Sequence, residues 1–69
     1  MSKTPVRGGE EVVVALVRAG FVRVRQKGSH VILVRDEITV VVPTHAGKDL
    51  PIGTLKKIMK IGRLSVEDL

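Results

Sequence analysis

The fold is decided by residues 21–43, which read FVRVRQKGSHVILVRDEITVVVP. From Phe21 to Lys27 the side chains alternate with the two-residue period of a β-strand. This period predicts Val22, Val24 and Gln26 on one side of the strand. The residues predicted on the opposite side are Phe21, Arg23, Arg25 and Lys27. The first strand therefore has a predicted cationic face.

Two short turns divide the rest of this stretch. Gly28-Ser29 precedes an apolar run that begins at or near His30 and spans residues 30–34, and a two-residue loop with glycine first is typical of a type II′ hairpin turn. Asp36-Glu37 precedes a third apolar run, residues 38–42, which Pro43 ends because proline cannot donate to a ladder. The stretch predicts three successive antiparallel strands.

A helix is predicted upstream, near residues 9–19. Apolar residues and one glycine recur there at the spacing of one helical face. They are Val13, Leu16, Val17 and Gly20. Two glutamates in the first turn and Arg18 in the last complement the helix dipole, and Gly20 suits the left-handed residue that ends a helix.

A second helix is predicted to open near Thr54, after a loop over residues 44–53. Its apolar face consists of Leu55, Ile58, Met59 and Gly62, and a basic face consists of Lys56, Lys60 and Arg63. Ser65 and Asp68 then resemble the ends of a capping box. The predicted class is α+β in the order α-β-β-β-α, with both helices on one face of a three-stranded antiparallel sheet, since no single layer can bury its apolar side alone.

The composition fits one small basic domain. The chain has 69 residues and a formal charge of +5, so a single domain over residues 1–69 is expected, with a short flexible N-terminus over residues 1–6. Cysteine is absent, which excludes disulfides and thiolate chemistry. No signal-peptide core or apolar run of about 18 residues occurs, so a cytoplasmic protein without a membrane segment is expected.

The charge is concentrated in the first half of the chain. Residues 1–35 contain seven Lys or Arg and two acids, whereas residues 36–69 contain five of each. Residues 18–35 contain five cations and no carboxylate. Such a patch attracts polyanions, although net charge also serves solubility alone.

Most kinds of catalytic site are excluded by the residues present. Two histidines without thiolates make a poor metal site, and they lack the spacing of a helical metal motif, so no metal is expected. Ser29 and His30 are neighbours on a strand and point to opposite sides, which argues against a hydrolase triad. No phosphate-binding glycine loop opens a helix, and no cofactor is expected.

RNA cleavage needs less apparatus, because the 2′-hydroxyl of the substrate is itself the nucleophile. A histidine can exchange the protons and a Lys or Arg can stabilise the phosphate, which makes His30 the candidate acid or base. His45 is a possible second proton-exchanging group or phosphate donor. Phe21 is the only aromatic residue and is expected to pack in the core, so recognition through stacked bases is disfavoured.

The ordered motifs resemble those of the HicA (YcfA-like) toxins, the mRNA interferases of type II toxin-antitoxin systems. The resemblance spans Val6 to Ser65, and its fold is similar to the double-stranded-RNA-binding domain. It rests on Ala19-Gly20-Phe21, Val24-Arg25-Gln26-Lys27-Gly28-Ser29-His30, Val42-Pro43-Thr44-His45, Gly53-Thr54-Leu55-Lys56-Lys57-Ile58 and Leu64-Ser65. It implies that His30 is the catalytic histidine of a metal-independent endoribonuclease, that Gly28 shapes the turn, and that a HicB-like antitoxin covers the site.

The expected substrate is mRNA. Arg25, Lys27 and Lys48 are the candidate phosphate contacts, and Ser29 either positions a phosphate oxygen or completes the turn. Two alternatives remain: a non-catalytic RNA-binding module of the same fold, and an interaction protein whose basic surface binds an acidic partner.

Overall fold

A computed structural model describes residues 7–45 and 48–69 of the chain. The elements are α1 (Gly9–Arg18), β1 (Val22–Lys27), β2 (His30–Arg35), β3 (Ile38–Pro43), α2 (Ile52–Gly62) and a short 3-10 turn, η1 (Val66–Asp68). The predicted α+β class and the order α-β-β-β-α are confirmed. The predicted flexible segment 1–6 lies outside the described residues.

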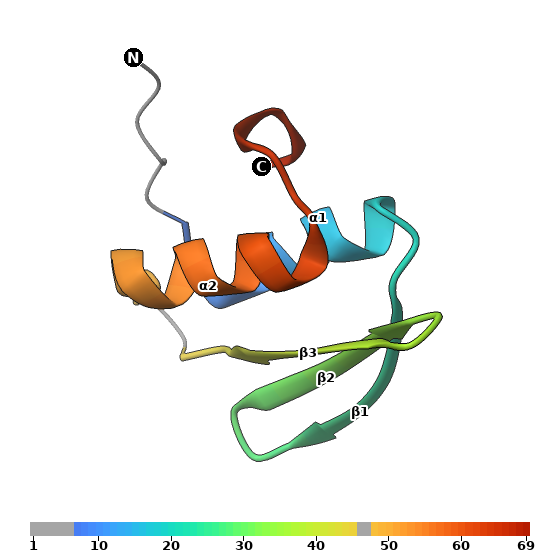
Figure 1. Ribbon diagram of the computed structural model, residues 1–69. Coiled ribbons are helices and arrows are strands. Elements are labelled where there is room, and N and C mark those ends of the chain that lie inside the picture. The colour runs from blue at the N-terminus through green and yellow to red at the C-terminus, as the bar shows by residue number, and fades with distance from the viewer. Residues whose placement is uncertain (1–6, 46–47) are drawn as a thin grey trace.

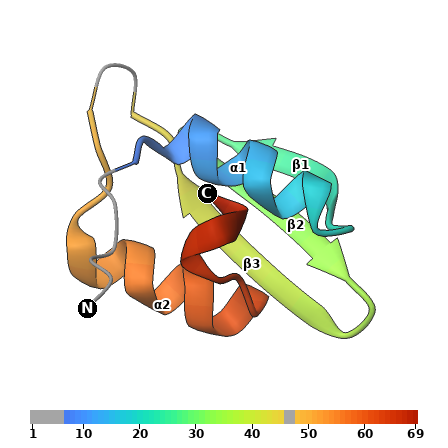
Figure 2. The same ribbon diagram turned by 90° about the horizontal axis from the view of Figure 1, so that it is seen from above.

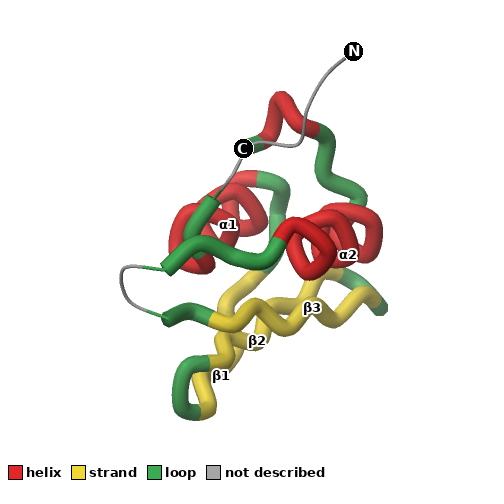
Figure 3. The backbone as a smooth tube through the Cα atoms, turned by 90° about the vertical axis from the view of Figure 1, so that its left-hand side faces the viewer, coloured by secondary structure: helices red, strands yellow, loops and turns green. Residues whose placement is uncertain are grey.

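The molecule has two layers. The sheet is antiparallel with the order β1-β2-β3, so β2 is central. Figure 1 and Figure 3 show α1 and α2 together on one face of the sheet, and Figure 2 shows them from above. The opposite face, which we call the open face, has no helix over it in the part of the chain that the structure describes.

The core lies between the helices and the sheet. On α2 the predicted apolar face is confirmed, since Leu55, Ile58, Met59 and Gly62 are all buried. On α1 the buried stripe is centred on Val12 and Leu16, both 0% exposed, whereas Val17 is 48% exposed. The predicted inner position of Val17 is therefore wrong, because successive helical residues are rotated by about 100° and Val17 falls outside this stripe.

The predicted cationic face of β1 needs one correction. Arg23 pairs with Leu33 and Arg25 pairs with Ile32, so two neighbouring residues of β2 oppose three residues of β1 and Val24 is the extra residue of a β-bulge. Leu33 is buried on the helix side, and Arg23 shares that side, where its guanidinium lies 3.9 Å from the Glu10 carboxylate on α1. Arg25 and Lys27 lie on the open face. Gln26, predicted on the same side as Val22, lies instead on the helix side, opposite the buried Val31.

Phe21 precedes β1 and belongs to the core, as expected, at 2% exposure. The Arg35 guanidinium lies 4.5 Å from the centroid of its ring and donates a 2.6 Å hydrogen bond to the Ala19 carbonyl. Gly20 has a φ of +101°, as expected of a residue that ends a helix. These contacts fix the connection between α1 and the sheet.

The second helix starts two residues earlier than predicted. Pro51 has extended backbone angles and is the N-cap, and its carbonyl accepts the Leu55 N–H at 2.9 Å. The helix ends at Gly62, and Arg63 adopts the left-handed conformation with a φ of +56°.

The predicted capping box near the C-terminus holds the short turn η1. The Ser65 N–H donates to the Asp68 carboxylate at 2.7 Å. Hydrogen bonds from the Glu67 backbone and from the Ser65 hydroxyl lower the pKa of Glu67. No helix in the described part of the chain has the length and apolar character needed to cross a membrane.

Candidate histidine site and nucleic-acid interface

His30 is the first residue of β2 and is exposed. The turn before it consists of Gly28 and Ser29. Gly28 has a φ of +59°, whereas Ser29 is not among the described residues with a positive φ. This is the φ pattern of the predicted type II′ turn, in which the first central residue must be left-handed. Gly28 therefore allows the chain to reverse so that His30 begins the strand beside Lys27.

Hydrogen bonds from two different elements hold this turn. The Ser29 carbonyl accepts the Thr44 N–H at 2.6 Å and the Thr44 hydroxyl at 2.9 Å. The side-chain amide of Gln26 donates to the Gly28 carbonyl at 3.0 Å. Because both carbonyls of the turn have donors, the backbone that presents His30 is fixed from the β3 side and from the β1 side.

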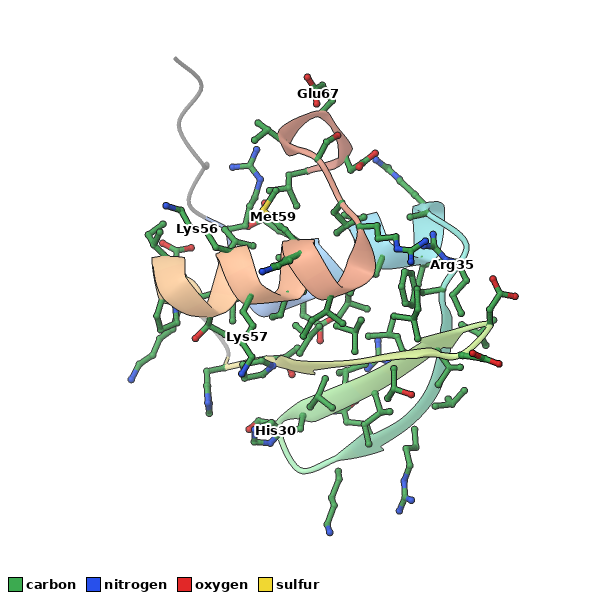
Figure 4. All side chains as sticks on the ribbon, in the orientation of Figure 1. His30, Arg35, Lys56, Lys57, Met59 and Glu67 are labelled. Atoms are coloured by element: carbon green, nitrogen blue, oxygen red, sulfur yellow. The ribbon has the colours of Figure 1, made fainter. Side chains whose placement is uncertain are left out.

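The open face brings His30 together with two cations. Lys27 pairs directly with His30 across β1 and β2, and residues in such a hydrogen-bonded pair have Cα atoms about 5.5 Å apart with side chains on the same face. Arg25 occupies the next open-face position of β1, opposite Ile32. All three polar side chains are exposed. Figure 4 shows His30 at the turn end of β2, away from the helices.

The other two predicted site residues lie elsewhere. His45 and Lys48 line an open cleft of about 490 Å³ on the helix side of the sheet. The cleft is also lined by the N-terminus of α1, by Gln26 of β1 and by Thr44, which follows β3. Three of the lining residues are acidic: Glu10, Glu11 and Asp49. Thr44 joins this cleft to the turn, since it lines the cleft and bonds to Ser29. His45 and Lys48 thus lie near the His30 end of the sheet without sharing its open face.

Sequence reasoning did not identify Thr44 and Gln26 as positioning residues. The sequence contains a signal for Thr44. A two-residue turn at Asp36-Glu37 pairs Arg35 with Ile38, and continuing this register along both strands sets Ser29 opposite Thr44. Gln26 had no comparable signal. Its contact with Gly28 depends on a side-chain rotamer, which a period of two does not specify.

This arrangement combines one proton-exchanging group with adjacent positive charge. An imidazole exchanges protons near neutral pH, and Lys27 and Arg25 can stabilise the charge of a phosphodiester beside it. Among the described residues no helix covers the open face, which leaves room there for a long, flexible polyanion.

Comparison with known proteins supplies a family. The family model described as HicA toxin of bacterial toxin-antitoxin matches residues 9–62, from the start of α1 to the end of α2. The match covers more than three quarters of the chain and includes both histidines. No curated protein matches the chain.

Proposed function

The chain belongs to the HicA family of toxins in bacterial toxin-antitoxin systems, and we propose that it is an endoribonuclease that cleaves mRNA without metal, with His30 as general acid or base. The observation that supports this most directly is the register of β1 and β2, which pairs His30 with Lys27 on an uncovered face. Membership of a toxin family and a histidine paired with a lysine together support RNA cleavage.

In the proposed reaction the 2′-oxygen of the substrate attacks the adjacent phosphorus. A bond from the 2′-oxygen to phosphorus forms, the bond from phosphorus to the 5′-oxygen breaks, and a 2′,3′-cyclic phosphate results. The 2′-hydroxyl loses a proton and the leaving 5′-oxygen gains one. His30 accepts the first proton or donates the second, solvent water takes part in the other transfer, and Lys27 and Arg25 stabilise the charge on the phosphate.

The remaining predicted residues have different proposed roles. Gly28 and Ser29 shape the turn, because Gly28 has a left-handed backbone and the two hydrogen bonds from Thr44 to the Ser29 carbonyl anchor the turn beside β3. Lys48 is proposed to contact a phosphate farther along the RNA, from the cleft on the helix side. His45 in the same cleft is a secondary candidate for proton exchange or phosphate binding.

The family also implies an antitoxin partner. We propose that this partner is HicB-like and that it neutralises the toxin by covering His30. A surface-exposed histidine on a face without helices is open to such a cover.

A non-catalytic RNA-binding module of the same fold is the second candidate function. The observation that favours it is that, within the described chain, His30 is the only histidine on the open face, so one proton transfer has no imidazole there. A binding module would use the same cations through backbone phosphates alone.

The test compares the parent protein with His30→Ala and His45→Ala on labelled RNA in excess EDTA. We expect fragments with 2′,3′-cyclic ends from the parent and a loss of about 100-fold or more in cleavage rate for His30→Ala. RNA affinity, measured in the same samples, should change little. The His45→Ala variant reports whether the cleft contributes. Intact RNA with clear binding by the parent would contradict the nuclease proposal and favour the binding module.

A further inference from the structure

A second groove lies between the outer edge of β3 and α2. Its volume is about 380 Å³. It is lined by Thr39, Val40, Val41, Thr54, Lys57, Ile58 and Ile61. Figure 2 shows α2 running beside β3, and Figure 4 shows the Lys57 side chain extending from α2 toward that strand. The groove therefore has a strand edge as one wall and a helix as the other.

The strand edge presents unpaired backbone groups. Thr44 donates its N–H to the Ser29 carbonyl, so residues 29 and 44 form a hydrogen-bonded pair. In an antiparallel ladder such pairs alternate, and in this register the next ones are at Val42 and Val40. The N–H and C=O groups of Thr39 and Val41 consequently point outward, and both residues line the groove. Within the described residues, no backbone hydrogen bond to these outward groups is found.

The side chains that line the groove indicate which kind of partner would bind there. Ile61 is 42% exposed on the helix side of the groove, and Val41, 46% exposed, pairs with Ile32 and faces the open side, so a strand added at this edge would have an apolar neighbour on each of its faces. Neither α2 nor β3 contains a carboxylate, and Lys57 is the charged residue of the lining. An extended segment with alternate apolar and acidic side chains would satisfy the strand edge, the apolar contacts and the lysine together.

We infer that this groove binds an extended, acidic and apolar segment of the antitoxin, which adds to the sheet as a fourth strand next to β3. Addition of a strand to an exposed sheet edge is a recurrent mode of peptide recognition, in which backbone hydrogen bonds give affinity and the alternate side chains give specificity. The inference rests on the antitoxin partnership of the proposed function but not on RNA cleavage.

A second copy of the chain fits the groove poorly. Two β3 strands paired about a twofold axis would bring one Lys57 toward the other, and each copy has a formal charge of +5. An acidic segment has the complementary charge. The position also suits inhibition, because a strand beside β3 lies two strand spacings, about 10 Å, from β2, which begins with His30.

The first experiment measures amide hydrogen exchange of the full chain by NMR, free and bound to its purified antitoxin. We expect antitoxin binding to slow exchange of the Thr39 and Val41 amides at least tenfold. These two amides report an added strand directly, since the ladder with β2 does not use them. Unchanged exchange at both amides in the saturated complex would overturn the inference. Slower exchange in the free protein with rising protein concentration would also overturn it, because the occupant would then be a second copy.

Two matched pairs of variants test the backbone and the charge, with antitoxin affinity as the readout. Val41→Pro removes the outward N–H and the valine side chain, whereas Val41→Ala removes the side chain alone. We expect Val41→Pro to weaken binding at least tenfold more than Val41→Ala. Lys57→Glu should weaken binding more than Lys60→Glu, which makes the same charge change on an exposed residue outside the groove.

Equal effects within both pairs would overturn the inference. The exchange measurement on the parent chain decides the matter if Val41→Pro does not fold. A failure of the proposed nuclease function has a separate signature, because it leaves antitoxin binding and amide protection intact while RNA remains uncleaved.

Discussion

Gly28 has a conformation that other residues adopt only at a cost. Its φ of +59° is left-handed, and a Cβ atom built there would meet nothing within 4 Å. The obstacle to a side chain at this position is therefore the backbone conformation and not the available space. Gly53 in α2 offers the matched case, since its Cβ would also meet nothing and its φ is not positive.

Replacing each glycine by alanine separates these two effects. Gly28→Ala should destabilise the protein by about 1–2 kcal/mol, the cost of a left-handed alanine, and should lower cleavage because the turn that presents His30 relaxes. Gly53→Ala should be neutral or stabilise the protein by up to about 1 kcal/mol, because alanine favours the helix. Urea unfolding of both variants checks this. Equal stability changes would show that the left-handed turn is not maintained in solution.

At the level of elements, the strands and helices follow from sequence period and turn residues, but the bulge does not. A bulge at Val24 has neither glycine nor proline to mark it, so no residue in β1 predicts it. The start of α2 at Ile52, two residues before the predicted start, is also unmarked in the sequence. Pro51 is the N-cap, and no side-chain hydrogen bond caps the helix. Local pattern thus predicts which elements form, and packing between them decides where side chains face.

The bulge places Arg23 and Arg25 on opposite faces of the sheet, so we expect them to differ in RNA binding. Arg25→Met should weaken RNA binding and reduce the slope of log affinity against log salt by about 0.7, the value for one phosphate contact to a single strand. Arg23→Met should leave both quantities nearly unchanged, because Arg23 lies on the helix side next to Glu10. Filter binding over a salt series checks the pair. A loss of affinity for Arg23→Met equal to that for Arg25→Met would contradict the observed register.

The whole molecule has its core on one side of the sheet and the open face, the proposed RNA-binding surface, on the other. This division explains which parts of the candidate site were predictable. His30, Lys27 and Arg25 belong to one hairpin, whose register follows from a two-residue turn. His45 and Lys48 follow β3 in a loop, and only the packing of α1 against that loop places them in a separate cleft. Long-range packing of this kind leaves no period in the sequence.

Two neighbouring residues of β2 test the division. Leu33 faces the helices and is 0% exposed, whereas Ile32 faces the open side and is half-buried. Leu33→Ala should cost about 2–5 kcal/mol through lost burial and the cavity left behind. A protein of 69 residues has a total stability of only about 3–10 kcal/mol, so this variant should unfold in part at 37 °C.

Ile32→Ala removes the same class of side chain one position away and should cost only about 1 kcal/mol, because water already reaches much of it. Thermal unfolding followed by circular dichroism compares the two variants directly. Because the open face is the proposed RNA-binding surface, Ile32→Ala also reports whether RNA covers this strand, through a change in affinity without a large change in stability. If both variants lost the same stability, the open face would be buried in solution, and the proposed RNA surface would have to lie elsewhere.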